Sequence, residues 1–326
     1  MRPSYSLSEV ERRLIVAWNL CADISVREIA ARADMREHRV RHALENLVRN
    51  GIIVPSFLID NYRLGFSDYG LFFAPSPEPS AMRAKFEQSL LSHPRIYWLS
   101  RLSGAFQYGA TFLARQPHEV VDFFACSQSL SKGAYPQKTL RIGVDCTWYS
   151  PNYLAPEVTE RESVSISARE RAPELNDADH SILVAMTRNP SSSTAQLARL
   201  TGMSASSLSY RIDRMRDEKI VRGRMYSIRT QLLGIFMYRI MVIDCGLSPE
   251  QRSQFLKTCA SSPHVVAVVV CTGSWDFELR FETEDPAALD EFCQSLIDTF
   301  GESIGSVLVS HQLSTLKRIA YPDDRS

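Results

Sequence analysis

The sequence predicts an α+β protein in which two winged helix-turn-helix domains alternate with two ferredoxin-like βαββαβ domains. Three observations favour this fold class. Residues 192–224 have the pattern of two short helices, a tight turn and a strand. The same pattern occurs in residues 25–56. Each copy is followed by short apolar runs that alternate with amphipathic helices, as expected of strands packed beneath helices.

The pattern is clearest in the later copy. A first helix is expected over residues 193–200, and Gly202 supplies the permissive residue of the turn. Ser204 should cap a second helix, because the apolar side chains after it recur at i, i+4 and i+7. These side chains are Leu208, Ile212 and Met215. A short strand is expected to follow, so the segment reads as a complete helix-turn-helix unit.

The opposite side of this second helix predicts contact with DNA. A helix-turn-helix places the N-terminal part of its second helix in the major groove, where hydroxyl, phenol and guanidinium groups reach bases and phosphates. The predicted DNA-binding residues here are Ser204, Ser206, Ser207, Tyr210, Arg211 and Arg214. Between Arg199 and Arg224 seven basic residues outnumber three acidic ones, which suits phosphate. The alternative is a solvated face of ordinary mixed charge.

The earlier copy lies 168 positions upstream and aligns without a gap, so that Leu7 matches Leu175 and Met35 matches Met203. Its second helix carries a different polar set. The predicted DNA-binding residues there are Arg36, His38, Arg39, Arg41 and His42. A spacing this long exceeds the roughly 20–50 residues of solenoid repeats, and it indicates duplication of a whole multi-part module.

The segments after each helix-turn-helix predict the ferredoxin-like sandwich. The first contains the expected order of strand, helix, two hairpin strands, helix and strand. These elements are predicted at residues 69–73, 78–93, 96–102, 105–113, 117–130 and 139–148. The order returns 169 positions later, where Gly104 matches Gly273 and Phe112 matches Phe281.

The domain organisation follows from these repeats. We expect a DNA-binding head at residues 1–60 (head 1), a ferredoxin-like domain at 61–150, a polar linker at 151–174 that could hold a short helix, a second head at 175–230 (head 2) and a second ferredoxin-like domain at 231–326. The two ferredoxin-like domains should pack about a pseudo-two-fold axis, because duplicated domains keep the self-complementary surface of their ancestor. Association into a homo-oligomer is expected as well.

Composition indicates an ordinary soluble protein. The 326 residues are 44% hydrophobic, which suits two or three domains. The N-terminal residues lack an apolar stretch of signal-peptide length, and no run approaches the roughly 18 residues of a membrane span, so a cytoplasmic location is expected. The seven cysteines are scattered and should be reduced thiols. A net charge of zero argues against non-specific coating of nucleic acid.

Signatures of catalysis and of metal binding are missing from the sequence. It contains no G-x-G-x-x-G, Walker loop, H-E-x-x-H or nucleophile elbow, so we expect no enzyme activity, no catalytic residue and no cofactor. His38 and His42 lie four apart on one predicted helix face and could chelate zinc. No third ligand follows at a usual spacing, so no metal site is predicted.

The order of elements and three segments resemble the Lrp/AsnC (feast/famine) transcription regulators. The segments are LNDADHSILVAM, GMSASSLSYRIDRMRDEKIV and TGSWDFELRFETED. The positions that match the family pattern are Asp177, Asp179, Ser204, Arg211, Ile212, Arg214, Ile220, Thr272, Gly273 and Asp276. The resemblance implies a transcription regulator that binds double-stranded DNA and dimerises through its ferredoxin-like domains.

The resemblance also implies an amino acid or related small molecule as effector, bound near the second hairpin. The predicted effector-binding residues are Thr272, Gly273 and Asp276. A glycine lets a ligand approach backbone N–H groups, and a carboxylate can hold an ammonium group. The alternative is that Gly273 only serves the hairpin and Asp276 is solvated. In the first half Asp276 is replaced by Gln107, so the effector should bind in the second half.

The first half departs from the family pattern in its DNA-binding head as well. Ala43 and Asn46 occupy the positions of Arg211 and Arg214. Different donor sets favour different bases, so we expect an operator of two unlike half-sites. The alternative is that head 1 has lost DNA binding and only supports the fold.

An enzymatic alternative comes from a second resemblance. Sirohaem decarboxylases are similar to fused Lrp-like units and act on a tetrapyrrole. They would be expected to bring histidine and arginine to the hairpin region, where this chain offers Arg101 alone. The expected function is therefore sequence-specific transcription regulation without chemistry.

Overall fold

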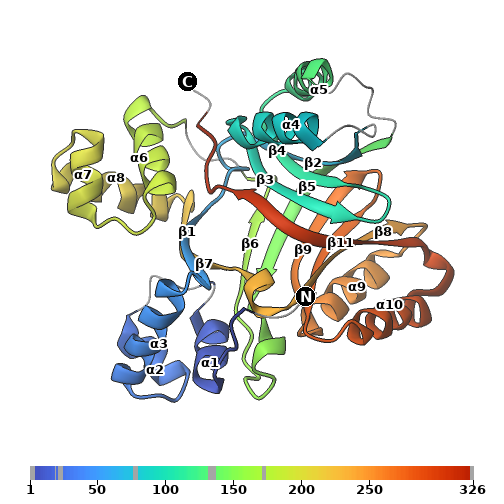
Figure 1. The fold of residues 1–326 in the computed structure, drawn as a ribbon, viewed down its shortest axis with the longest axis horizontal. Helices are drawn as coiled ribbons and strands as arrows, with labels where there is room; N and C mark the ends of the chain where they lie inside the picture. The colour runs from blue at the N-terminus through green and yellow to red at the C-terminus, as the bar shows by residue number, and fades with distance from the viewer. Residues whose placement is uncertain are drawn as a thin grey trace. The chain divides into compact units, whose positions relative to one another are not determined.

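The computed structural model describes residues 4–18, 20, 25–75, 80–130, 137–170 and 174–323 (Figure 1). The chain forms two compact units. Unit 1 consists of Met1–Pro55, Asp145–Ser165 and Arg224–Gln312, and unit 2 consists of Ser56–Val144, Ile166–Gly223 and Leu313–Ser326. Each unit therefore combines segments from both halves of the sequence.

Unit 1 contains the helices of head 1, which are α1 (Glu9–Trp18), α2 (Val26–Arg32) and α3 (Glu37–Arg49), followed by the start of β1 (Ile53–Ile59). The predicted stripe of α3 is buried, since Val40 and Leu47 are fully covered. The apolar cluster around them also includes Leu233, Ile235 and Val266. Head 1 therefore packs against the ferredoxin-like domain of the second half of the sequence.

Unit 2 has the reciprocal composition. It contains the helices of head 2, which are α6 (Asp177–Arg188), α7 (Thr194–Thr201) and α8 (Ala205–Asp217), followed by the start of β7 (Val221–Ile228). The predicted stripe of α8 is buried. Its apolar cluster includes Phe57, Phe66 and Leu113 from the first half of the sequence. Head 2 therefore packs against the first ferredoxin-like domain.

The sheet of the first ferredoxin-like domain has the predicted strand order. Its elements are β2 (Ser67–Ala74), α4 (Ser80–Ser92), β3 (Ile96–Ser103), β4 (Tyr108–Ala114), α5 (His118–Leu130) and β5 (Gln137–Tyr149). The strands are arranged β5-β2-β4-β3, and α4 and α5 lie over one face (Figure 1). The helix predicted at 78–93 begins at Ser80, and residues 76–79 lie outside the described residues.

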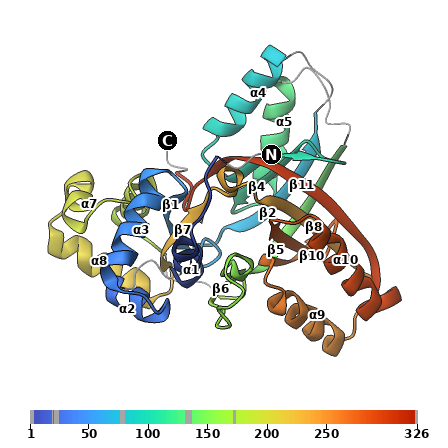
Figure 2. The same cartoon turned by 60° about the horizontal axis from the view of Figure 1, so that its bottom comes forward.

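The second ferredoxin-like domain repeats this arrangement within unit 1. Its elements are β8 (Phe236–Asp244), α9 (Pro249–Ser261), β9 (Val265–Gly273), β10 (Phe277–Thr283), α10 (Ala287–Phe300) and β11 (Ile304–Arg318), with η2 (Thr230–Leu233) before β8 and η3 (Gly301–Ser303) before β11. The strands are arranged β11-β8-β10-β9. Helices α9 and α10 lie together over one face of these strands (Figure 2).

The turn before each second helix uses the same backbone conformation in both heads. Gly202 ends α7 with φ of 68°, as its role in the turn predicted. At the matching position of head 1, Asp34 adopts φ of 52°. Aspartate tolerates this left-handed region better than most residues, because its short side chain can bond locally.

The segment predicted as a polar linker at 151–174 contains regular structure and a buried part. It forms the 3-10 helix η1 (Asn152–Leu154) and the strand β6 (Ser163–Ser167). Tyr153 and Leu154 are buried and belong to the apolar cluster of head 1. The short helix that the linker could hold is present, whereas β6 and the buried apolar group were not predicted, because the polar composition of the whole segment hid them.

Two expectations from composition can be compared with the structure. The six cysteines that lie among the described residues are thiols, and Cys21 lies outside them. In the described part of the chain, no helix combines the length and the apolar character that crossing a membrane requires.

Candidate nucleic-acid interface and hairpin site

Helix α3 of head 1 separates a buried face from a cationic face. Because Val40, Ala43, Leu44 and Leu47 turn into the core, the side chains between them point outward. The outward set is the one predicted for DNA, Arg36, His38, Arg39, Arg41 and His42, and all five residues are exposed. Within the described residues, none of these side chains has a hydrogen-bond or ion-pair partner. They are therefore available to an external anion.

Helix α8 of head 2 presents a different surface. Ser204 caps the helix by accepting a hydrogen bond from the N–H of Ser207 at 3.2 Å, as predicted. Ser206, Ser207 and Tyr210 point outward, and Tyr210 is 71% exposed. The N-terminal half of α8 therefore offers hydroxyl groups and one aromatic ring.

Arg211 and Arg214, also predicted for DNA, are bound within the protein. Both guanidinium groups contact the carboxylate of Asp179, which is completely buried near the start of α6. The distances are 2.8 Å from Arg211 and 2.6 Å from Arg214. Burial alone would raise the pKa of Asp179, but the hydrogen bonds from both arginines outweigh it and lower this pKa below its ordinary value.

Head 1 has a buried acid at the same position with neutral partners. Glu11 accepts hydrogen bonds from the Tyr5 hydroxyl at 2.6 Å and from the Asn46 amide at 2.8 Å. The N–H of Ser8 donates to its other oxygen at 2.9 Å. Burial opposes ionisation of Glu11, but these hydrogen bonds lower its pKa. Where head 2 has Arg214 beside Asp179, head 1 thus has Asn46 beside Glu11, and neutral donors supply the hydrogen bonds to the carboxylate.

The sequence pattern predicts no function for Asp179 or Glu11. The sequence did contain a signal for this contact. Asp179 lies in the first turn of one helix, and Arg211 and Arg214 lie three residues apart on another. The pattern of a single helix face cannot show this pairing, because the acid and the arginines lie on different helices.

The predicted effector residues meet at the hairpin between β9 and β10. Thr272 and Gly273 are exposed, and Gly273 has φ of 123°, a conformation that favours glycine. The Oδ2 atom of Asp276 accepts a hydrogen bond from the N–H of Asp244 at 2.8 Å. No donor among the described residues bonds its Oδ1 atom. Gly104, in the matching hairpin, has φ of 106°, so both turns require a glycine.

Near the matching hairpin of the first half, an arginine and a carboxylate form an ion pair. Arg101 binds Glu87 through two nitrogens, at 2.7 and 2.5 Å, and the Tyr108 hydroxyl donates to the same carboxylate at 2.8 Å. The hydrogen bond from Arg101 is the main cause of the lowered pKa of Glu87. Arg101 is therefore engaged with a carboxylate of its own domain.

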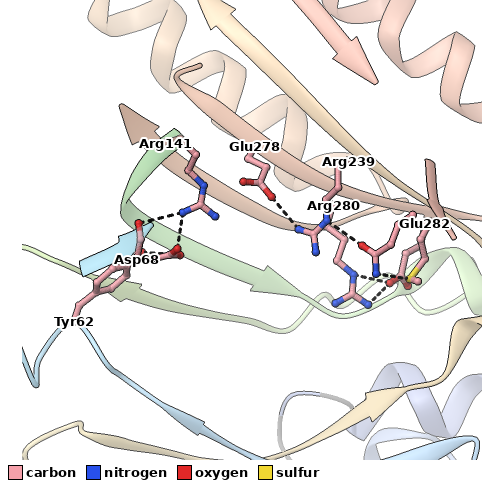
Figure 3. Close-up of polar contacts among 9 residues, drawn as sticks. Tyr62, Asp68, Arg141, Arg239, Glu278, Arg280 and Glu282 are labelled. Atoms are coloured by element: carbon pink, nitrogen blue, oxygen red, sulfur yellow. Dashed lines mark hydrogen bonds and ion pairs between the residues drawn. The ribbon is translucent and has the colours of Figure 1, made fainter. Parts of the chain in front are cut away.

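Buried ion pairs line the sheet face opposite the helices in unit 1. Arg239 on β8 contacts Glu278 on β10 at 3.1 Å, and Glu278 is almost fully buried (Figure 3). On the same strand Glu282 accepts hydrogen bonds from Arg280 at 2.8 Å and from the Tyr153 hydroxyl at 2.9 Å. These charges are satisfied by one another, and they fix strand positions.

Unit 2 has its own buried pair on the corresponding face. Arg141 on β5 contacts Asp68 on β2 at 2.7 Å (Figure 3). The arginine lies against the backbone of Gly70, where an added Cβ atom would come within 2.4 Å of its Nε atom. The glycine thus makes room for a buried guanidinium. Among the described residues, no group of three histidine, cysteine or carboxylate side chains could hold a metal ion.

Two protein-family models match the second half of the chain. A winged helix-turn-helix DNA-binding model matches residues 175–222, and the Lrp/AsnC ligand binding domain model matches residues 241–320. The HTH-type transcriptional regulator FL11 of Pyrococcus furiosus is 24% identical over 145 residues, which are 44% of this chain and 90% of that regulator. The glutamate uptake regulatory protein of Zymomonas mobilis is 23% identical over 124 residues, 38% of this chain and 76% of that protein.

One solved structure is similar over nearly the whole chain. The crystal structure of the siroheme decarboxylase NirDL covers 97% of this chain and 94% of its own, with a TM-score of 0.58 and 10% sequence identity. This likeness shows the fold. The family matches show that the second half carries a winged helix-turn-helix DNA-binding region and a ligand-binding region of the Lrp/AsnC type.

Proposed function

We propose that this chain is a sequence-specific DNA-binding transcription regulator that arose by tandem duplication and performs no chemistry. Head 1 and head 2 are its two DNA-reading domains. One observation carries the proposal. The second helix of each helix-turn-helix motif, α3 in head 1 and α8 in head 2, turns polar side chains outward beside a buried apolar stripe. The match of residues 175–222 to a DNA-binding model supports it.

The second ferredoxin-like domain is the proposed effector domain. The Lrp/AsnC ligand binding domain model covers it, and the Oδ1 atom of Asp276 has an open acceptor position beside the exposed Gly273. An amino acid fits this chemistry, because its ammonium group can bind the carboxylate and its own carboxylate can accept backbone N–H groups. Assembly of several chains in the cytoplasm completes the proposal.

Selection of binding sites from random duplex DNA tests the function. The purified chain should enrich a defined sequence through successive rounds, and its affinity for that duplex should exceed its affinity for random duplex by at least ~1,000-fold, the usual lower bound for specific binding. Recovery of unselected sequence with no such preference would count against a regulator.

Thermal-shift screening with amino acids tests the effector. A ligand that binds the folded protein raises its melting temperature. The rise should disappear in Asp276→Ala and persist in Gln107→Ala, the matched variant of the first half. Equal shifts in wild type and Asp276→Ala would move the effector away from this hairpin.

A tetrapyrrole enzyme is the second candidate, favoured by the fold shared with siroheme decarboxylase NirDL over 97% of the chain. The engagement of Arg101 by Glu87 opposes it, because this arginine was the one available to tetrapyrrole carboxylates in the first hairpin. Titration with an iron tetrapyrrole separates the candidates. A regulator leaves the absorption spectrum of the tetrapyrrole unchanged, whereas an enzyme of this type shifts it at stoichiometric protein.

A further inference from the structure

We infer that the two heads divide their contacts with DNA, an inference that rests on the proposed function. Head 1 supplies the contacts to phosphate through α3, and these carry the salt dependence of binding. Helix α8 of head 2 reads bases through Ser206, Ser207 and Tyr210 and itself adds little salt dependence, because Asp179 retains its two arginines. This assignment argues against the alternative that head 1, which departs from the family pattern, has lost DNA binding.

The first step is the geometry around Asp179. Its carboxylate is completely buried, and each of its oxygens meets one guanidinium, Oδ1 that of Arg211 and Oδ2 that of Arg214. The side chains of these arginines are only 27% and 36% exposed. Moving either one to a phosphate would leave a buried carboxylate with less compensation, which is strongly unfavourable. The two arginines therefore stay with Asp179 when DNA is near.

The second step is the contrast with head 1. The acid there, Glu11, is satisfied by Tyr5, Asn46 and Ser8, which carry no charge. No arginine of α3 is needed inside the head. The cationic side chains of α3 consequently remain outside, where condensed counterions of DNA would be released on contact.

The net charges of α3 and α8, each counted with its N-cap residue, also differ. Residues 36–49 contain four arginines and two glutamates, a surplus of two positive charges. Residues 204–217 contain three arginines and two aspartates, a surplus of one. Two of those three arginines bind Asp179, and the third, Arg216, lies 3.2 Å from Asp213. All three positive charges of α8 are thus paired with carboxylates within the head.

The groups left on α8 suit base edges. Serine hydroxyls donate to or accept from any base, and an exposed aromatic ring can pack against a thymine methyl group. Tyr210 is among the most exposed large side chains of the described residues. Head 2 should therefore contribute sequence preference out of proportion to its charge.

The salt dependence of binding tests this division. The affinity for a random duplex and for the selected duplex is measured by fluorescence anisotropy across a series of salt concentrations. Arg39→Ala and Arg41→Ala should each reduce the slope of log K against log salt by about 1, as expected for loss of one phosphate contact. Lys257→Ala on α9 removes an exposed charge outside the heads and serves as the control, with an unchanged slope.

Head 2 needs a variant that keeps its fold. The combination Asp179→Asn, Arg211→Ala and Arg214→Asn removes the acid together with both charged partners, and it places at positions 211 and 214 the residue types that head 1 has there, Ala43 and Asn46. Circular dichroism and thermal unfolding establish that it is folded. We expect its slope to equal that of wild type, and we expect Tyr210→Ala to lower the preference for the selected duplex with the slope retained.

The outcomes are distinct. An unaltered slope in both α3 variants, or a slope reduced by about 2 in the folded head 2 variant, overturns the division of contacts. A wild-type chain that binds neither duplex at any salt concentration overturns the proposed function itself. A wild-type chain that binds with a slope near zero also contradicts the division, because α3 would then contact no phosphate.

Discussion

Arg214 of helix α8 lies 2.6 Å from the buried carboxylate of Asp179 in helix α6, at the position where head 1 places Asn46 beside Glu11. The two heads thus share a buried acid between their first and third helices and satisfy it with opposite chemistry. A charged clamp holds head 2 together, and a neutral cage holds head 1 together. This difference leads to the first prediction.

Removal of both arginines should destabilise head 2. Arg211→Ala with Arg214→Ala leaves Asp179 buried without a cation, so we expect a loss of about 3 kcal/mol in the free energy of unfolding. Because the folded pKa of Asp179 lies below its ordinary value of 3.8, the clamp stabilises above that pH and its contribution fades as the pH falls through the lowered pKa. Urea unfolding at pH 7 and pH 3 measures this, and an equal loss at both would contradict the clamp.

Protonation of His93 should weaken unit 2 in acid. Its ring lies between Phe112 and Phe123, and its Nδ1 atom accepts the N–H of Arg95. Burial, with smaller effects of Lys317 and Arg95, lowers its pKa to about 4. Between pH 6.5 and 4, His93 binds a proton in the unfolded chain but stays neutral in the folded protein. The free energy of unfolding therefore falls as the pH is lowered from 6.5 to 4.

The expected loss for His93 is about 2 kcal/mol, because partial exposure of the ring screens the full effect. His93→Gln keeps an acceptor for Arg95 and should remove most of this pH dependence. Chemical denaturation of both proteins between pH 7 and 4 provides the measurement. Identical pH profiles for the two would show that His93 is not the responsible group.

The reciprocal packing of heads and ferredoxin-like domains predicts which helices respond to a core substitution. Leu233→Ala should cost about 2 kcal/mol and increase hydrogen exchange in α1 and α3, because Leu233 shares their apolar cluster. Leu113→Ala, in the apolar cluster of head 2, should act on α6 and α8 instead. Faster exchange in the head of the same sequence half would refute the pairing.

Arg161 should anchor the segment of residues 151–174 to the end of α9. It donates to the carbonyls of Ser262 at 2.7 Å and Val265 at 2.5 Å, near the end of α9, and lies 4.7 Å from the Tyr149 ring. Arg161→Ala leaves these carbonyls without their charged donor and should cost about 2 kcal/mol. Arg161→Lys should recover roughly half, because an ammonium lacks the planar fork. Thermal unfolding ranks the three proteins. An Arg161→Lys variant no more stable than Arg161→Ala would show that only the planar guanidinium satisfies these carbonyls.

The sequence predicted the features that depend on local pattern. The stripes of α3 and α8, the left-handed turn at Gly202 and the cap at Ser204 all follow from spacing and from the chemistry of single residues. The order of both ferredoxin-like domains also followed from periodicity. Such features need no knowledge of distant partners.

The missed features depend on partners far apart in the chain. Periodicity can assign Leu14 to a core, but it cannot show that head 1 shares this core with η2, where Leu233 lies more than 200 residues later. Tyr210 is exposed on the outward face of α8, whereas Arg214, expected on the same face, contacts Asp179 of another helix, which the pattern of α8 alone cannot indicate. Tyr153 was hidden within a polar segment, since one buried aromatic creates no period.

Hydroxyl-radical footprinting on the selected duplex tests the proposal that one chain carries two unlike DNA-reading heads. We expect two protected half-sites of different sequence, centred about one helical turn or a multiple apart. Arg39→Ala should weaken protection of one half-site and Tyr210→Ala that of the other. Symmetric protection over a palindrome, with both half-sites altered alike by either substitution, would contradict the account.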